Sequence, residues 1–191
     1  MNEEIKEETK QEAKLMKLNL GSSTDYKEGW VNLDIEAGKD IYGASVKVDV
    51  VWDLNNYPWP FEDNTFDKIN ANAILEHLES RVKPWNELKR IAKSGCKLHV
   101  DVPHYSGYTG YDDPTHYHRY SQHTADMVAQ MWGFKLISNK IIFSWGHKAF
   151  FLKIFNPIVN IWPRVYERFF ANIFPSQELA WEFEVVKEVV K

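Results

Sequence analysis

Short runs in which apolar and polar residues alternate divide much of the chain into segments of strand length. The first two are Met-Lys-Leu-Asn-Leu at 16–20 and Val-Asn-Leu-Asp-Ile at 31–35. A period of two is typical of β-strands with one face against a core. Five more segments are predicted as strands for the same reason, at 46–51, 66–71, 97–102, 135–143 and 179–190.

Two other segments repeat with the helical period. The first has its apolar positions on one helical face and is predicted to end at Gly95; these positions are Val82, Trp85, Leu88, Ile91 and Ala92. The second is predicted to begin near Ser121 or Thr124 and to end at Gly133. The aromatic segment 148–174 predicts one or two helices interrupted at Pro157 and Pro163, serving either as core or as a lid.

Strands that alternate with helices predict an α/β fold. We expect a doubly wound, mostly parallel, Rossmann-like sheet with helices on both faces and an antiparallel last strand. Ligands of such sheets bind beyond the carboxyl ends of the strands, where the strand order reverses. Residues 22–30 are few for a parallel crossover, which usually needs about a dozen residues. The first connection is therefore predicted to be a tight loop or a single helical turn.

Composition narrows the class of protein. The 191 residues fit one domain, which we place at 15–191, after a charged segment at 1–14 that we expect to be a disordered tail or frayed helix. A formal net charge of -4 argues against a nucleic-acid partner. Cys96 is the sole cysteine, so we expect a cytoplasmic protein without disulfides. No stretch predicts a transmembrane helix, but the aromatic segment is compatible with peripheral membrane contact, and the oligomeric state stays open.

A glycine turn and a carboxylate follow the first two predicted strands. Gly21 comes directly after the first strand, and Asp34 closes the second. In nucleoside-binding sheets such a turn lets the backbone approach the ligand, while the carboxylate accepts hydrogen bonds from ribose hydroxyls. The pair predicts a nucleoside site at this edge.

Two further motifs extend the pattern. The sequence PFEDNTFDKI at 60–69 precedes and enters the fourth strand, and AILEHL at 73–78 follows it. In this order and spacing, residues 16–145 resemble the class I S-adenosylmethionine-dependent methyltransferases, in particular small ones with a type 11 methyltransferase domain. The resemblance implies methyl transfer, with S-adenosylmethionine as the cofactor.

The resemblance also implies which residues bind the cofactor. They are Leu20, Gly21 and Ser22 beside the methionine, Asp34 at the ribose, Ile35 on the adenine face, Asp53 and Leu54 at the adenine edge, and Asn70, Ala71 and Asn72 beside the methionine and sulfonium. The chain departs from the family at three positions. Asn19 stands where an acidic residue is common, and Ser23 and Asp25 replace glycines.

Histidines after the fifth strand are the candidates for handling a proton. His104, and His116 within a DPTH element similar to one in this subgroup, are predicted as general bases, because imidazole titrates near neutral pH. Two alternatives stay open. The histidines could instead hold a long loop to the body, or His116, His118 and His123 could bind zinc or a divalent iron-type ion. Methyl transfer itself requires no metal, so we assign no metal ligand.

The acceptor is not identified by the sequence. A small molecule or a glycan or lipid head group is favoured over a macromolecule, with the methyl group passing by in-line displacement. A catalytically silent methyltransferase-like binding module is the alternative, because the glycine turn is reduced. A nicotinamide oxidoreductase is disfavoured, since the chain lacks GxGxxG and a helix directly after it.

Overall fold

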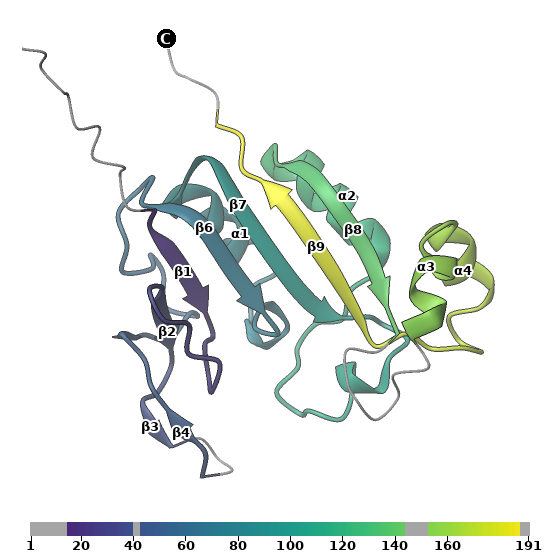
Figure 1. Ribbon diagram of the computed structural model, residues 1–191, viewed down its shortest axis with the longest axis horizontal. Helices are drawn as coiled ribbons and strands as arrows, with labels where there is room; N and C mark the ends of the chain where they lie inside the picture. The colour runs from purple at the N-terminus through teal and green to yellow at the C-terminus, as the bar shows by residue number, and fades with distance from the viewer. Residues whose placement is uncertain (1–14, 40–42, 144–152, 188–191) are drawn as a thin grey trace, which may run out of the picture.

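The computed structural model describes residues 15–39, 43–143 and 153–187. Their centre is a seven-stranded sheet in the order β5-β2-β1-β6-β7-β9-β8 (Figure 1). Its strands are β1 (Lys17–Leu20), β2 (Val31–Asp34), β5 (Val50–Val51), β6 (Phe66–Asn72), β7 (Ala92–Pro103), β8 (Lys135–Ile142) and β9 (Glu178–Glu184). The predicted tail at 1–14 lies outside the described residues.

The predicted fold class is confirmed. β1 pairs in parallel with β2 and β6, β2 with β5, and β6 with β7, whereas β9 runs antiparallel to both β7 and β8. The link from β1 to β2 is a loop with no helix, as its length predicted. β9 ends at Glu184, earlier than predicted; Val185 still exchanges backbone hydrogen bonds with Gly95 and Cys96, and the end of the predicted strand, at 188–190, lies outside the described residues.

The third predicted strand is wrong as a single element. Val46 belongs to β4 (Ser45–Val46), which forms a separate hairpin with β3 (Gly38–Lys39), and the sheet resumes only at Val50. Asp49 separates the two pieces, because its carboxylate accepts hydrogen bonds from the backbone and side-chain amides of Asn32, at 2.8 and 2.9 Å. The Asp49 amide also donates to the Asn32 carbonyl at 2.8 Å, so side-chain bonds reinforce the backbone contact with β2 where the sheet resumes.

The helices are distributed unevenly over the two faces of the sheet. α1 (Lys83–Ile91) and α2 (Gln122–Trp132) contact each other and lie together behind the sheet in Figure 1. In register across that face are Ile69, Leu98 and Phe183, all buried. The opposite face carries Asn70, His99 and Glu182 in register, and no helix of the described residues covers it along β1, β6 and β7.

The helix ends show how local sequence signals succeed or fail. α2 begins with a capping box between Ser121 and Thr124 and ends at Gly133, whose φ of 70° is left-handed, as predicted. α1 ends at Ile91, not at Gly95. Gly95 instead lies within β7, at a φ of 86°. Gly95 was expected to end the helix, but its left-handed conformation serves an irregular position within the strand instead.

The aromatic segment folds as two short helices beyond β8, within its described part. They are α3 (Phe155–Val159) and α4 (Pro163–Phe169). Pro163 begins α4, as expected for the residue that needs no backbone donor, but Pro157 lies inside α3 and does not interrupt it. None of the helices in the described ranges is long and apolar enough to cross a bilayer.

Candidate functional site

A cavity of about 630 Å³ opens at the carboxyl ends of β1, β2 and β6, beside the segment after β5. We call it the polar pocket. Seven of the ten predicted cofactor residues line it, namely Gly21, Ser22, Asp34, Ile35, Asp53, Leu54 and Asn72. The other three do not, because the side chains of Leu20 and Ala71 are buried in the core and Asn70 is bonded to Asn19.

Gly21 is required by both conformation and space. Its φ is 60°, a left-handed value that side chains disfavour. A Cβ atom built there would lie 2.6 Å from Cγ1 of Ile74, well inside contact distance. The turn thus brings backbone against the loop after β6 and leaves the pocket open above it.

Asp34 holds the glycine turn. Its Oδ2 accepts a hydrogen bond from the Ser23 amide at 2.7 Å, and its Oδ1 accepts one from the Ile35 amide at 2.8 Å. Each carboxylate oxygen has a second lone pair, so the carboxylate can still accept bonds from a ligand in the pocket.

Three asparagines, Asn19, Asn32 and Asn70, form a hydrogen-bond network beneath this turn, where the family commonly has an acidic residue. Asn19 is 1% exposed and donates to the Asp25 carbonyl at 2.8 Å and to Oδ1 of Asn32 at 3.2 Å. Asn70 in turn donates to Oδ1 of Asn19 at 2.8 Å. The network spans β1, β2 and β6, so the loop that lacks two family glycines is held by side-chain amides.

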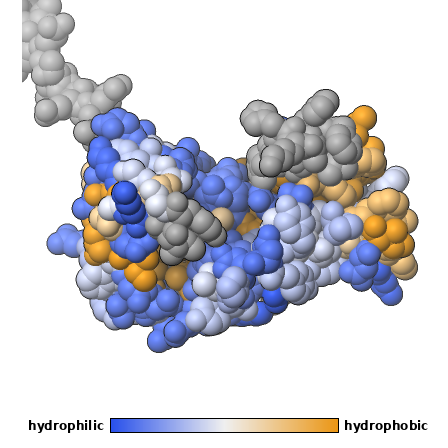
Figure 2. Space-filling model, turned by 90° about the horizontal axis from the view of Figure 1, so that it is seen from below, coloured by the Kyte–Doolittle hydropathy of each residue, from blue (hydrophilic) through white to orange (hydrophobic). Residues whose placement is uncertain are grey.

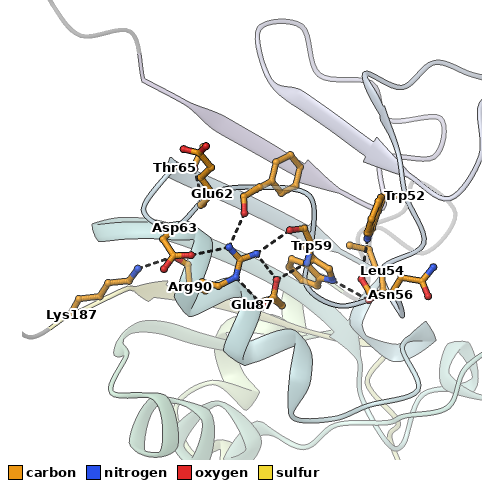
Figure 3. A network of polar contacts seen from close by, with 11 residues as sticks. Trp52, Leu54, Asn56, Trp59, Glu62, Asp63, Thr65, Glu87, Arg90 and Lys187 are labelled. Carbon is orange, nitrogen blue, oxygen red and sulfur yellow. Dashed lines mark hydrogen bonds and ion pairs between the residues drawn. The ribbon is translucent and has the colours of Figure 1, made fainter.

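The start of the PFEDNTFDKI motif, with Trp59 directly before it, supports the wall of the polar pocket that follows β5. Arg90 of α1 donates to the Trp59 and Phe61 carbonyls at 3.0 and 2.7 Å, and it pairs with Asp63 and Glu87 (Figure 3). Its hydrogen bonds to Glu87 and then to Asp63 raise the pKa of the guanidinium above its usual value. The motif is therefore structural in this protein.

Trp59 carries that support to the pocket wall. Its backbone amide donates to Oε2 of Glu87 at 2.7 Å, and its indole nitrogen donates to the Leu54 carbonyl at 3.0 Å (Figure 3). Leu54 lines the pocket, and Asp53 next to it bonds the Asn55 amide through Oδ1 at 2.8 Å. The segment after β5 is thus fixed from both sides.

A second, smaller cavity of about 100 Å³ adjoins the polar pocket. We call it the acidic cavity; it is lined by Asn72, Ala73, Glu76, Asp101, Val102, Pro103, Thr109, His116 and Glu178. Glu76 is 1% exposed, and burial, together with Glu178 and Asp101, raises the pKa of its carboxyl to about 8. Among the described residues, Oε2 of Glu76 and Oδ1 of Asp101 have no hydrogen-bond partner.

His116 is brought to this cavity by the loop before α2. The backbone carbonyl of Glu76 accepts hydrogen bonds from the Tyr117 and His118 amides, at 2.8 and 3.2 Å. The His116 ring therefore lies 4.5 Å from the His77 ring, centroid to centroid. Its Nδ1 is buried without a partner in the described chain. Its predicted role in proton transfer stays a prediction, with the residue at the right edge of the sheet.

His104 lies away from the polar pocket. It is fully buried, its Nδ1 accepts from the Ser106 amide at 3.2 Å, and its Nε2 lies 3.0 Å from Oε1 of Glu167 on α4. Both ring nitrogens are thus used within the fold. This arrangement favours the structural alternative for His104, whose role as a general base stays a prediction.

The alternative metal set is not brought together. His118 accepts a hydrogen bond from Nε of Arg81 at 3.0 Å, and His123 pairs with Asp126 on the exposed side of α2. Neither reaches His116. A different group does: Glu76, His77 and His116 offer ligand atoms that all lie within 4.8 Å of one another.

A third cavity, of about 720 Å³, lies beside α3 and α4. We call it the apolar pocket; aromatic and branched side chains such as Phe143, Phe155, Ile158, Trp162 and Phe170 line it. Many apolar side chains here are exposed, Trp162 by 70%. Figure 2 shows hydrophobic surface gathered at this end of the molecule.

Several lining residues of the polar pocket had no separate sequence signal. Trp52 lines it, as do Ile74 and His77 of the AILEHL motif and Thr115 of the DPTH element, none of which was given a role of its own. The contact that explains the place of Ile74, against Gly21, is visible only in the structure.

The strand order, with an antiparallel strand between β7 and β8, and a glycine turn facing two aspartates define a Rossmann-like methyltransferase fold. Residues 31–100 match the family described as "Methyltransferase domain". An S-adenosylmethionine-dependent methyltransferase from Archaeoglobus fulgidus superposes with a TM-score of 0.61 at 17% identity, covering 89% of this chain and 86% of that one. One from Mesorhizobium loti gives 0.57 at 11% identity, covering 89% and 90%.

A short segment is also similar to an uncharacterized methyltransferase of Schizosaccharomyces pombe. The identity is 49% over 39 residues, which is 20% of this chain and only 14% of that protein. Together, the family match and the fold confirm the predicted resemblance to class I S-adenosylmethionine-dependent methyltransferases.

Proposed function

We propose that this protein binds S-adenosylmethionine in the polar pocket and transfers its methyl group to an acceptor that enters beside His77 and His116. The observation that carries the proposal is the convergence of Gly21, Asp34 and Asp53 on one cavity of about 630 Å³. A volume of this size suits a nucleoside-bearing cofactor.

Each wall has a role in this proposal. The Asp34 carboxylate accepts the ribose hydroxyls, the Asp53 segment faces the adenine, and the Gly21 turn lets the methionine part approach the backbone. The cofactor supplies an activated methyl group, so the protein has to orient the acceptor, exclude water and remove one proton. His77 and Thr115, which line the pocket beside the acidic cavity, mark the acceptor's side.

The acceptor is proposed to be amphiphilic, with a lipid or lipid-linked head group favoured. The short helix η2 (Tyr108–Gly110) separates the two regions that such a molecule would occupy: Tyr108 lines the apolar pocket, and Thr109 lines the acidic cavity. An apolar tail beside α3 and α4 would leave its polar end near His116. Incubation with radiolabelled cofactor and separated cell extracts tests this: label in the lipid phase supports it, and label confined to water-soluble products contradicts it.

Calorimetric titration with S-adenosylmethionine and S-adenosylhomocysteine tests the cofactor. We expect both to bind, and Asp34→Asn to weaken binding by about 10-fold, since an amide loses the charge and one acceptor site. Asp126→Asn, on the surface of α2, is the matched control and should bind as the parent does. Binding of neither compound would favour the silent module.

A further inference from the structure

Three side chains between the polar pocket and the acidic cavity form a group that the proposed methyl transfer does not require. η1 (Leu75–His77) follows β6 after Ala73, whose φ of 49° turns the chain sharply. Glu76 and His77 thereby lie beside His116, which comes from the loop before α2. The two segments are joined by backbone hydrogen bonds, so their approach belongs to the fold.

We propose that Glu76, His77 and His116 form a binding site for one divalent transition-metal ion, with Zn²⁺ the best match. Two imidazoles and one carboxylate are a ligand set that suits zinc and leaves a position open for substrate or water. The three ligand atoms lie within 4.8 Å of one another. Ligands of bound zinc are about 3–3.5 Å apart, so small side-chain rotations would complete the site.

The carboxylate is already desolvated and directed at this position. Glu76 is 1% exposed, and its Oε2 has no partner within the described parts of the chain. A buried carboxylate oxygen without a partner costs free energy, and a bound cation would offset that cost. No lysine or arginine is among the described residues that line the acidic cavity, so none supplies a positive charge at its wall.

Hydrogen bonds orient the His77 ring for metal binding. The Thr115 hydroxyl donates its hydrogen to Oδ1 of Asp113 at 2.6 Å. Nδ1 of His77, 2.8 Å from that hydroxyl, must therefore be the donor in their bond, which leaves Nε2 with a lone pair. A ligand histidine whose other nitrogen is bonded in this way is the usual arrangement around zinc.

The ion would act on the acceptor, a role that rests on the proposed function. His77 lines the polar pocket and His116 lines the acidic cavity, so the open position faces both. An acceptor hydroxyl on the ion would lose its proton more readily, and Oδ1 of Asp101 could receive it. The oxygen then attacks the methyl carbon, the C–O bond forms, and the S–C electron pair returns to sulfur.

Metal titration of the full chain, after treatment with a chelator and without cofactor, tests the site. We expect one Zn²⁺ or Co²⁺ per chain, a visible Co²⁺ spectrum typical of nitrogen ligands, and weak response to Mg²⁺. Glu76→Gln and His116→Ala should each weaken binding by roughly 100-fold or more. His123→Ala is the matched control, because His123 lies on α2 outside the group, and it should bind normally.

Thermal unfolding separates loss of the site from loss of the fold. Zn²⁺ should raise the melting temperature of the parent and of His123→Ala, but not of Glu76→Gln, which should be folded because glutamine keeps the shape of the buried side chain and is uncharged. Uptake that is absent, or equal in the parent and Glu76→Gln, overturns the metal site. Cofactor titration of the same metal-free samples reports on the proposed function separately.

Discussion

The polar pocket and the apolar pocket are similar in volume, about 630 and 720 Å³, but they are built in opposite ways. The polar pocket is shaped by backbone and by side chains that are hydrogen-bonded beneath it, such as Asn19 and Asp34. The apolar pocket is shaped by exposed side chains of α3 and α4. Ligand binding in the polar pocket should therefore be lost when a single carbon is added at Gly21, whereas the apolar pocket should tolerate substitution of its side chains.

The largest effect is expected at the glycine turn. Gly21→Val should weaken S-adenosylmethionine binding more than about 100-fold, or about 3 kcal/mol, because a Cβ would lie 2.6 Å from Ile74 at a left-handed φ. Calorimetric titration measures this.

A compensating change sharpens the result. Gly21→Ala combined with Ile74→Gly removes all three Ile74 atoms that would lie within 2.8 Å of the added Cβ but keeps the strained φ, so part of the affinity should return. If Gly21→Val bound the cofactor as the parent does, the polar pocket would not be the cofactor site.

A smaller effect is expected at His104, which joins the strand region to the aromatic end. His104→Ala should lower the free energy of unfolding by about 2–3 kcal/mol, because it removes a fully buried ring and its contact with Glu167, whose Oε1 then keeps only the hydrogen bond from the Gln122 amide. Chemical denaturation measures the loss. Cofactor affinity of the folded fraction should be unchanged, and a selective loss of binding with normal stability would restore a direct role for this residue.

The uncovered face of the sheet should respond to pH. His99 lies between Asp101 and Glu182, at 2.8 and 2.7 Å, and hydrogen bonding to Asp101 raises its pKa above the usual value of 6.5. The folded state therefore favours the protonated ring. The stability from this pair is full below about pH 6.5 and is lost as the pH rises through the raised pKa.

The corresponding variant is His99→Gln. It should cost about 1 kcal/mol of unfolding free energy at pH 6 and less at pH 9, as measured by denaturation at both values. An equal cost at the two values would show that the charge of His99 contributes nothing.

The smallest effect is expected in the apolar pocket. Trp162 is 70% exposed, so Trp162→Ser should change unfolding free energy by less than about 0.5 kcal/mol and leave cofactor affinity within twofold. Transfer to a lipid acceptor should fall, however. A large loss of stability would show that this side chain belongs to the core rather than to a binding surface.

The sequence predicted the strands and their order along the chain more accurately than the environment on each face of the sheet. In β7, Lys97, His99 and Asp101 alternate with apolar residues, whereas parallel strands buried on both faces are apolar almost throughout. That alternation already indicated that one face of β7 is polar, although the alternation of strands with helices along the chain favoured helices on both faces. The third strand was divided by Asp49, whose partner Asn32 is distant in sequence and could not be inferred from a local pattern.

The residues of the site that follow directly from the position of a strand end were predictable. The histidines were less so, because tertiary contacts determine which of them is buried within the fold. Gly21, Asp34 and Asp53 end or follow strands, so their convergence follows from a parallel sheet. His104 and His116 have the same chemistry and similar surroundings in sequence, but contact with Glu167 buries one within the fold. Such a partner, 63 residues away, has no local signature.

The position of β9 has a consequence for how the chain is made. It is the last strand of the described residues, yet it fills the gap between β7 and β8, which do not pair with each other. Until residues 178–184 have been made, both strands present unpaired edges that can recruit other nascent chains. Completion of the sheet therefore waits for β9, long after β7 has paired with β6.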